Sequence, residues 1–395
     1  MRIVLWGTYD LGKPRVRLMR RALHELGDVE EIHADIWSGV EDKSQVSRLA
    51  AKLGFALKMM AAYPGLLWRY LRAAPHDVVV VGYMGQFDVL VLCALARLRG
   101  KPIVWDAFLS LYDTVVADRR LVSRKSMLAR ALYAIEWLAC RAASRIVLDT
   151  RAHAAFFETT YRIRRDKLGA VFVGAETEAF PPQPERAAGD GPLTILFYGQ
   201  FIPLHGIETI VAAAQASAER PWRWRLIGDG QDAAKIRALI DEGECANIDW
   251  TPWVDYDDLI AEIRQADICL GVFGASDKAA RVIPNKVFQI LAAGRALITR
   301  DGPGVRELLS PADAHVWLTA PADAGALVAA VADAETQMRT LNAPGAALHA
   351  RARARFSLSA LATDWGAILS SAQKRKNPRA VVGKTIKLGG EGADE

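Results

Sequence analysis

The sequence predicts an α/β protein with two doubly wound domains, and three observations support this fold class. Short apolar runs alternate with amphipathic helical segments along most of the chain. The run DVVVVG at residues 77–82 is apolar almost throughout, which is typical of a parallel strand covered on both faces. At 395 residues the chain exceeds one ordinary core, and the stretch PPQPERAAGDGP at 181–192 replaces periodicity with proline, glycine and charge, as a linker does.

The composition is that of a globular, slightly basic chain. Hydrophobic residues make up 51%, charged residues 24%, and the formal net charge is +5. The pI is about 9.0 and the mean hydropathy is +0.08. No apolar run approaches the roughly 20 residues of a membrane-spanning helix. This basic balance permits a nucleotide, an anionic lipid or a nucleic acid as partner and selects none of them.

The N-terminus and the cysteines both favour a cytoplasmic protein. The opening MRIVLWGTYD is typical of a buried strand and lacks the long apolar core and small-residue cleavage site of a signal peptide. The cysteines are scattered in apolar or helical surroundings without metal-ligand spacing. We therefore expect reduced structural thiols, with neither a disulfide nor a zinc site, at Cys93, Cys140, Cys245 and Cys269.

The first half of the chain opens with a strand, a turn and a helix. We expect the strand at 2–6, the loop at 7–15 and the helix at 16–26. The loop contains glycines but lacks the GxGxxG spacing of a dinucleotide site. Further strands are expected at 77–82, 102–105, 145–148 and 170–173, and further helices at 87–99 and 127–142, with another around His153.

Three polar residues, Asp106, Ser110 and Asp113, follow the strand at 102–105. Ligands of doubly wound sheets collect at the carboxyl ends of strands, so these residues are site candidates. A carboxylate that caps the next helix explains Asp106 equally well. For His153, beside a helix start, we expect capping or packing in preference to catalysis.

One long stretch of the first half is both basic and apolar. Residues 43–76 contain no acidic residue, and Lys and Arg alternate there with Leu, Met and Trp, with one interruption at Pro64-Gly65. Helices of this kind suit the headgroup region of an anionic membrane, although two packed surface helices give the same pattern. We expect membrane contact through residues 48–72, which the acid-free run 119–130 extends. Neither run interleaves aromatic residues as a single-stranded nucleic-acid track does.

The second half repeats the alternation of strands and helices. Its glycine-containing turns after strands allow a ligand to approach the backbone closely. We expect strands at 193–199, 224–227, 248–250, 266–272 and 296–299, and helices at 207–218, 256–265 and 324–341.

The segment 276–309, SDKAARVIPNKVFQILAAGRALITRDGPGVRELL, contains the most informative helix. Pro284 fits its first turn, apolar residues recur at helical spacing, and Gly294 can close it with a left-handed residue. Lys286 and Gln289 lie three residues apart and therefore share a face. They stand near a helix N-terminus, whose free N–H groups attract phosphate, so we expect an anion site.

This segment resembles the donor-binding helix of the family-four retaining glycosyltransferases of the group 1 type. Their pattern is Glu, seven residues, Glu, and then a small-residue run that ends in Ala-Gly before a strand. When the pattern is anchored on Ala293-Gly294, its two Glu positions hold Arg281 and Gln289, so both carboxylates are missing. In a variant within the wider family, cations hold the donor diphosphate. The resemblance assigns this role to Arg281 and Lys286, and a donor contact to Gln289.

The resemblance also covers the first strand and helix of the second half. The family has Gly-Arg after that strand and Lys-Gly before that helix, and its Arg and Lys grip the diphosphate. This chain has Gln200 and His205 at these places. Both can donate hydrogen bonds to phosphate oxygens, but neither supplies Lys or Arg charge at neutral pH unless His205 is protonated. Because this chain differs from the family here, Arg281 and Lys286 remain as the expected cations that hold the diphosphate.

Further site residues follow from the same resemblance. Gly228 and Gly230 match the family's Gly-Asp-Gly, and Trp253 falls where its base-binding strand ends, although a core position is the alternative. The loop that begins at Gly7 is assigned to the floor of the cleft, and Asp106 to contact with the transferred sugar.

The resemblance implies the GT-B architecture, in which two Rossmann-like domains face each other across a cleft. The domains would span residues 1–182 and 193–356, joined by a linker at 183–192. A closing helix at about 357–373 would cross back onto the first domain, and 374–395 would be a disordered tail.

The expected activity is sugar transfer from a nucleoside diphosphate sugar to an acceptor hydroxyl, with retention and without metal or cofactor. Contact with an anionic membrane favours a lipid or lipid-linked saccharide acceptor, as in envelope polysaccharide or glycolipid synthesis, and a peripheral place at the inner face of the cell membrane. Three alternatives remain: a sugar-nucleotide epimerase of the same fold, a nucleotide-sugar-binding homologue without turnover, and a nucleic-acid-binding protein, for which no recognition motif is present.

Overall fold

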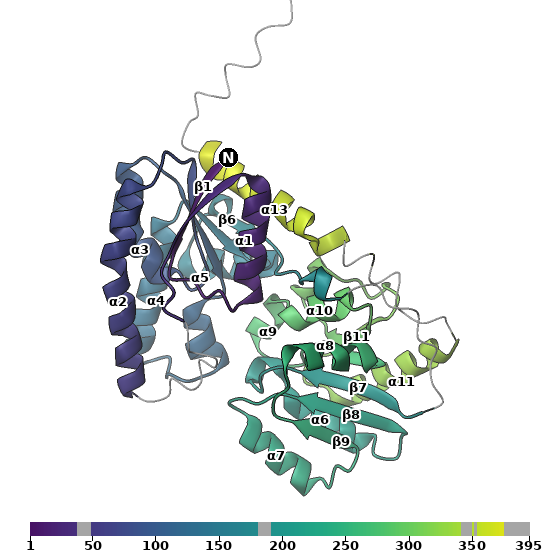
Figure 1. Ribbon diagram of the computed structural model, residues 1–395. Coiled ribbons are helices and arrows are strands. Elements are labelled where there is room, and N and C mark those ends of the chain that lie inside the picture. The colour runs from purple at the N-terminus through teal and green to yellow at the C-terminus, as the bar shows by residue number, and fades with distance from the viewer. Residues whose placement is uncertain (38–48, 181–190, 341–349, 351–353, 375–395) are drawn as a thin grey trace, which may run out of the picture.

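A computed structural model describes residues 1–37, 49–180, 191–340, 350 and 354–374. These residues form two six-stranded sheets, and helices cover both (Figure 1). Every strand pairing in the two sheets is parallel. The α/β fold class expected from the alternating pattern is confirmed.

The first sheet has the strand order β2-β1-β3-β4-β5-β6. Its four-residue strand β3, Val78–Val81, is completely buried, as its apolar run predicts. The other strands are β1 (Arg2–Gly7), β2 (Asp28–His33), β4 (Ile103–Phe108), β5 (Arg145–Leu148) and β6 (Leu168–Ala170). The helices are α1 (Pro14–Leu26), α2 (Leu49–Arg72), α3 (Gln86–Leu98), α4 (Met127–Ala142) and α5 (Arg151–Tyr161).

The second sheet has the strand order β12-β11-β10-β7-β8-β9. Its strands are β7 (Leu193–Tyr198), β8 (Trp222–Ile227), β9 (Ile248–Thr251), β10 (Ile268–Leu270), β11 (Ala296–Arg300) and β12 (Val316–Thr319). Its helices are α6 (Ile207–Ala216), α7 (Ala233–Glu242), α8 (Tyr256–Gln265), α9 (Asp277–Arg281), α10 (Asn285–Ala292) and α11 (Ala324–Thr340).

Strand order reverses at β7 in the second sheet. The chain runs from β7 through β8 to β9 on one side, and then returns to place β10 on the other side of β7. Loops that leave the carboxyl ends of β7 and β10 therefore diverge, and such a reversal is the usual ligand-binding place of a doubly wound sheet.

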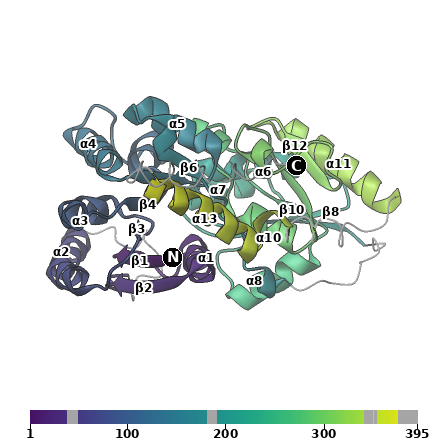
Figure 2. The ribbon, with the colours of Figure 1, turned by 90° about the horizontal axis from the view of Figure 1, so that it is seen from above.

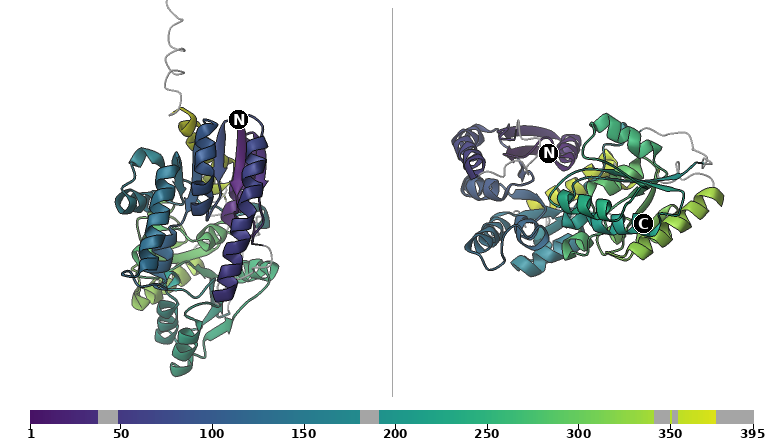
Figure 3. Two further views of the ribbon diagram at one scale, coloured as in Figure 1. Left: turned by 90° about the vertical axis from the view of Figure 1, so that its left-hand side faces the viewer. Right: turned by 90° about the horizontal axis from the view of Figure 1, so that it is seen from below.

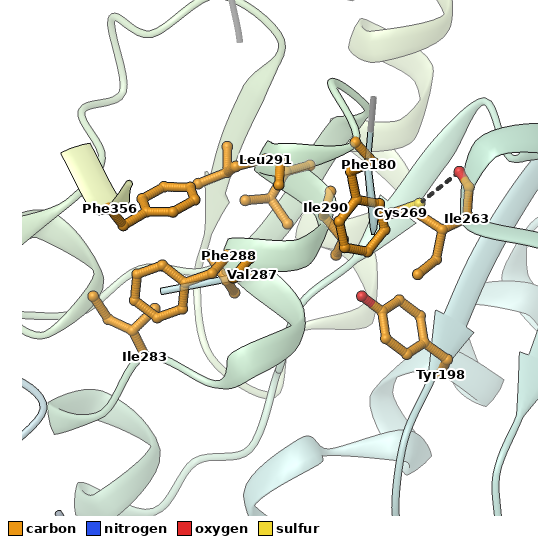
Figure 4. Packing of buried hydrophobic residues seen from close by; sticks show 14 of the residues in the cluster. Phe180, Tyr198, Ile263, Cys269, Ile283, Val287, Phe288, Ile290, Leu291 and Phe356 are labelled. Atoms are coloured by element: carbon orange, nitrogen blue, oxygen red, sulfur yellow. Dashed lines mark hydrogen bonds between the residues drawn. The ribbon is translucent and has the colours of Figure 1, made fainter. Parts of the chain in front are cut away.

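Helix α10 is buried on every side. Its residues from Lys286 to Ala292 are all buried, and Val287, Phe288 and Ile290 pack in one core cluster with Phe180 and Phe356 (Figure 4). Pro284 lies just before the first helical residue, at the N-cap. Gly294 has a φ of +66°, the left-handed conformation expected after this helix.

Helix α13 (Leu358–Lys374) follows the second sheet but packs on the first domain beside α1 (Figure 2). Leu361, Trp365 and Leu369 are buried in one cluster with side chains of β1, β3 and α1. The Arg15 guanidinium lies 5.5 Å from the centroid of the Trp365 ring. This helix therefore ties the end of the chain to its beginning.

The expected interruption at Pro64 is wrong. Helix α2 continues through Pro64 from Leu49 to Arg72 and lies on the outer side of the first domain (Figure 3). Proline removes one helical hydrogen bond, but the buried side chains of Tyr63, Leu66 and Tyr70 hold both halves of the helix against one core.

The strand expected at 170–173 is displaced towards the N-terminus, to β6. Beyond Ala170, the carbonyl groups of Val171 and Phe172 accept hydrogen bonds from the Arg15 guanidinium, at 2.6 and 3.0 Å. The Arg15 side chain thus bonds to carbonyl groups that, in a longer β6, would have been directed at a neighbouring strand.

Three further points concern whole-chain expectations. All four cysteines are free. Among the described residues, no helix has the length and apolar character needed to cross a membrane. The tail 375–395 and most of the linker lie outside the described residues.

We predict that Trp365→Ala lowers the free energy of unfolding of the first domain by about 3–5 kcal/mol, because it leaves a cavity between α13 and α1. Trp365 is 1% exposed, whereas Trp68 on α2 is 55% exposed, so Trp68→Ala is the matched control and should change stability by less than about 0.5 kcal/mol. Urea denaturation followed by circular dichroism measures both. Equal midpoints for the two variants would contradict the docking of α13.

Candidate functional site

A pocket of about 610 Å³ lies at the carboxyl ends of β7, β8 and β9. Positive φ angles at Gly199 (+130°) and Gly228 (+149°) let these two turns approach each other. A Cβ atom on Gly228 would stand 1.9 Å from the Gly199 carbonyl oxygen, so only glycine fits. The lining residues are Tyr198, Gly199, Gln200, Ile227, Gly228, Asp229, Pro252, Trp253, Val254 and Leu259.

Lys286 places an amine beside this pocket. It is 5% exposed, its Nζ atom has no hydrogen-bond partner, and it lies 3.7 Å from the centroid of the Phe197 ring. A Cβ atom on Gly199 would stand 3.0 Å from Nζ, which locates the amine against the Gly199 turn. Burial lowers the pKa of Lys286 well below its ordinary value. An anion bound here would supply the missing partner.

His205 stands on the other side of the same turn. Its Nδ1 atom bonds to the Gln200 carbonyl oxygen, so Nδ1 carries the proton. Burial and the neighbouring Lys286 lower the pKa of His205 well below its ordinary value. The neutral ring therefore presents Nε2 as an acceptor, and it can donate to a phosphate only after taking up a proton. A bound anion would favour that protonation.

Gln200 is exposed and faces the first domain. Its Oε1 atom accepts a hydrogen bond of 3.2 Å from Nη2 of Arg119. A second hydrogen bond of 3.2 Å runs from Nε2 of Gln231 to the Arg119 carbonyl oxygen. The pocket therefore has a neighbour from the first domain that the sequence analysis did not place there.

Gln289 lies behind the pocket wall. The Tyr198 hydroxyl is 3.2 Å from its Oε1 atom and 3.2 Å from the Lys286 carbonyl oxygen. Gln289 is 8% exposed, so it fixes Tyr198 and the first turn of α10. The shared face of Lys286 and Gln289 is present, but it is buried instead of solvated.

Trp253 and Gly230 belong to the turns around the pocket mouth. Trp253 is 72% exposed and lines the pocket, so the alternative of a core position is wrong. Gly230 has a φ of +156°, and a Cβ there would meet the Phe201 backbone at 2.7 Å. Gly230 therefore shapes the turn, but it is not one of the residues that line the pocket.

Asp106 does not reach the cleft. It lies within β4, is 0% exposed, and pairs with Arg15 of α1 at 2.7 Å. Burial raises the pKa of Asp106 although the Arg15 guanidinium opposes the shift. This carboxylate holds α1 against the sheet, and its burial argues against the sugar contact that the resemblance assigns to it.

Arg281 is also engaged elsewhere. Its Nη2 atom pairs with Asp113 of the first domain at 2.9 Å, and its guanidinium lies 4.1 Å from the centroid of the Phe156 ring. Its carbonyl oxygen accepts a hydrogen bond from the Thr150 hydroxyl. Arg281 therefore joins the two domains, and its charge is already paired. Lys286 Nζ, by contrast, is buried without a hydrogen-bond partner.

Lys278 and Asp118 form a second ion pair between the domains, in addition to that of Arg281 and Asp113. Lys278 Nζ donates to the Thr114 hydroxyl at 2.7 Å and lies 3.7 Å from Asp118, which also accepts from the Ser276 hydroxyl at 3.1 Å. Asp113 and Asp118 are the ends of a π-helical turn, Asp113–Asp118. This turn was missed by the sequence analysis, in which only Asp113 appeared as a candidate.

The remaining candidates have packing roles. Ser110 donates to the buried carboxylate of Glu136 at 2.6 Å. A Cβ atom on Gly7 would meet Asp88 at 2.5 Å, so Gly7 lets Asp88 approach and bond to the Thr8 backbone at 2.9 Å. His153 is buried and bonds to Asp149 at 2.7 Å, which agrees with the packing role expected for it.

Another hollow of about 570 Å³ lies at the opposite, amino ends of β7, β8 and β9. Its Arg225 side chain pairs with both Glu262 and Asp249. The charges that line this hollow satisfy one another, so it offers no buried amine comparable to Lys286. Within the described part of the chain, no group of three or more His, Cys, Asp and Glu side chains is placed to hold a metal ion.

Comparison with known proteins finds similarity to one family over the second domain. Residues 192–336 match the sequence profile described as Glycosyl transferases group 1. The second domain is therefore similar to the group 1 glycosyl transferases. The resemblance stated from the sequence is thereby confirmed. WcaI of Escherichia coli K12, named for colanic acid biosynthesis, is 30% identical over 115 residues, which span 28% of this chain and 28% of WcaI.

Solved structures extend the similarity of fold to nearly the whole chain. Sucrose-phosphate synthase from Thermosynechococcus elongatus matches with a TM-score of 0.69 and 17% identity, over 94% of this chain and 98% of that one. Anabaena HepE in complex with UDP matches with a TM-score of 0.62 and 14% identity, over 94% and 100%. The expected GT-B architecture is confirmed.

We predict that Lys286→Met stabilises the ligand-free protein by about 1–3 kcal/mol, because it removes an amine buried without a partner. Since burial lowers the pKa of Lys286, the unfolded chain binds the proton more readily at pH values between the folded pKa and the ordinary value of 10.5. The wild type therefore gains stability as the pH rises through this window.

Urea denaturation of both proteins from pH 6 to pH 10 tests this linkage. The advantage of the methionine variant should be largest at low pH and shrink towards pH 10. A variant that is less stable than the wild type at every pH would show that the amine has a partner in the folded protein.

Proposed function

We propose that this protein transfers a sugar from a nucleoside diphosphate sugar to an acceptor hydroxyl. The unpartnered amine of Lys286, buried beside the pocket at the end of β7, is the observation that carries the proposal. A diphosphate placed against this amine and the Gly199 turn gains a cation in a site shielded from water. Such a cation is worth most as negative charge develops on the leaving group.

The chemical step breaks the bond between the anomeric carbon and the diphosphate oxygen, and forms a bond from that carbon to the acceptor oxygen. The acceptor proton goes to the released diphosphate. We infer from the family resemblance that configuration is retained and that no metal takes part. Cations of the chain then stabilise the leaving diphosphate in place of a metal.

The nucleoside is proposed to bind against the exposed ring of Trp253 at the pocket mouth. We propose uridine as its base, a choice supported by the UDP bound in the structure of HepE. An acceptor in an envelope polysaccharide or glycolipid is supported by the similarity to WcaI, which is named for colanic acid biosynthesis.

We further propose that α2 rests on an anionic membrane. Exposed apolar residues recur on one stripe of this helix, where Leu57 is 62% and Met60 64% exposed, with Trp68 and Leu71 above 50%. Helix α2 lies on the side of the first domain that is farthest from the second domain (Figures 1 and 2). Lys58 and Arg72 flank it, and the Arg72 guanidinium lies 4.3 Å from the centroid of the Trp68 ring. Amphipathic helices with this chemistry lie in the headgroup region.

Two basic residues of the expected membrane surface, Arg69 and Arg119, make other contacts. Arg69 donates to the carbonyl oxygens of His33 and Glu31, each at 3.0 Å, so it anchors α2 to β2. Arg119 faces Gln200 across the cleft. The side chains of residues 48–53 lie outside the described residues. The proposed surface therefore consists of the α2 stripe with its flanking cations, at the inner face of the cell membrane.

A second candidate function is binding of a nucleotide sugar without turnover. It is favoured by one observation: Gln200 and the neutral His205 supply no permanent charge to the phosphate site. Binding and turnover therefore have to be measured separately.

We predict that UDP raises the melting temperature without Mg²⁺, by more than GDP, CDP, TDP or ADP. At a concentration 100 times Kd, a ligand adds about 2.7 kcal/mol to the free energy of unfolding. UMP should shift the melting temperature less than UDP, and Lys286→Met should reduce the difference between them because the second phosphate loses a cation. Differential scanning fluorimetry provides these shifts.

Incubation with UDP-sugars and a membrane extract then tests turnover. Release of UDP that depends on the extract supports the transferase. Binding without release of UDP supports the non-catalytic homologue, and the absence of any nucleotide shift rejects both.

We predict that Lys58→Glu combined with Arg72→Glu releases the protein from vesicles that contain 30% phosphatidylglycerol, because both flanking charges then repel the surface. The control reverses Lys235 and Arg339, which are exposed on the second domain and give the same change in net charge. Vesicle sedimentation should separate the two variants. Equal loss of binding in both would mean that net charge, and not the α2 surface, is responsible.

A further inference from the structure

Arg119 is held at the cleft by contacts from both domains. Its backbone nitrogen donates to the Thr114 carbonyl oxygen at 3.0 Å, which fixes it at the end of the π-helical turn. Its side chain reaches the second domain, where Nη2 bonds to Oε1 of Gln200 at 3.2 Å. Because Gln200 lines the pocket, the guanidinium stands at the pocket's rim.

The Arg119 guanidinium is paired with an amide and not with a carboxylate. In the described part of the chain it forms no ion pair, and its Nε atom is buried without a hydrogen-bond partner. The two other cations near this interface differ, since Asp113 pairs with Arg281 and Asp118 with Lys278. Arg119 thus keeps both its charge and unused donors.

Its charge also persists in the absence of ligand. Burial lowers the pKa of Lys286 and of His205, so the charged form of each is disfavoured when no anion is present. A guanidinium does not deprotonate in proteins. The pKa of His205 is lowered by Lys286 and, to a smaller extent, by Arg119, which indicates that the guanidinium acts on the space around the imidazole.

We propose that Arg119 is a ligand of the donor diphosphate contributed by the first domain, and that it supplies the permanent charge that Gln200 cannot. This inference rests on the proposed function of the pocket. The phosphate replaces the amide oxygen of Gln200 as the acceptor of the Arg119 guanidinium, whose planar fork suits bidentate contact with phosphate oxygens. Lys286 approaches the diphosphate from the second domain.

The two proposed ligands of the diphosphate come from different domains. Lys286 belongs to α10 of the second domain and Arg119 to the first, so a bound diphosphate would join them through its own oxygens. Only a donor that carries the diphosphate gains both contacts. Donor binding would therefore stabilise the contact between the two domains.

The test is isothermal titration of UDP into the wild type, Arg119→Ala, and the double variant Arg119→Ala with Gln200→Arg. Loss of a charged hydrogen-bond donor should weaken UDP binding about 10- to 100-fold in the single variant. The double variant should regain most of the affinity, because position 200 lines the same pocket and restores the charge. Arg97→Ala, an exposed arginine of α3, is the matched control and should bind UDP like the wild type.

The outcomes of the titrations distinguish a phosphate ligand from a residue with another role. If Arg119→Ala binds UDP as tightly as the wild type, Arg119 is not a ligand, although the proposed function stands. If affinity falls and Gln200→Arg does not restore it while the melting temperature stays unchanged, the contribution of Arg119 is not its charge at the phosphate site, and the inference is overturned. If the wild type binds no nucleoside diphosphate, the proposed function itself fails.

Discussion

The buried amine of Lys286 is the constraint around which the second domain is arranged. An amine without a partner opposes folding, so the surrounding contacts must hold it in place. Helix α10 does this by burying Val287, Phe288 and Ile290 in the core (Figure 4). The Tyr198 hydroxyl fixes the first turn through the Lys286 carbonyl oxygen. The apolar packing of one helix thus stabilises a polar group that is incomplete until an anion binds.

The contact between the domains depends on a different principle, which is complete pairing. The π-helical turn presents Asp113 and Asp118, and each accepts a cation of the second domain. Glu307 of the second domain accepts hydrogen bonds of 2.8 and 2.7 Å from the backbone nitrogens of Arg151 and Ala152, where a helix N-terminus favours negative charge. Charges that hold the domains are therefore satisfied within the protein, whereas those at the pocket are not.

This difference explains what the sequence could and could not predict. Apolar runs and helical periodicity depend on neighbours in the chain, so the fully buried β3 and the bounds of α4 and α8 were predicted well. Lys286 was singled out because it stands near a helix start and shares a face with Gln289, whereas Gln200 and Trp253 were singled out because they match positions of the family pattern. Asp106 was assigned to the site because it follows a strand, and Arg281 because it matches the family pattern, but their partners are remote in the chain: Arg15 lies 91 residues from Asp106, and Asp113 lies 168 residues from Arg281. No local pattern reveals which cation is already paired.

The charge of the pocket and the protonation of Lys286 and His205 are linked. Before an anion arrives, burial disfavours the charged forms of Lys286 and His205, which lessens their repulsion with the Arg119 guanidinium. A diphosphate reverses this balance, because its negative charge favours protonation of both groups. We propose that uptake of protons accompanies diphosphate binding, and that departure of the diphosphate returns the site to its less charged state.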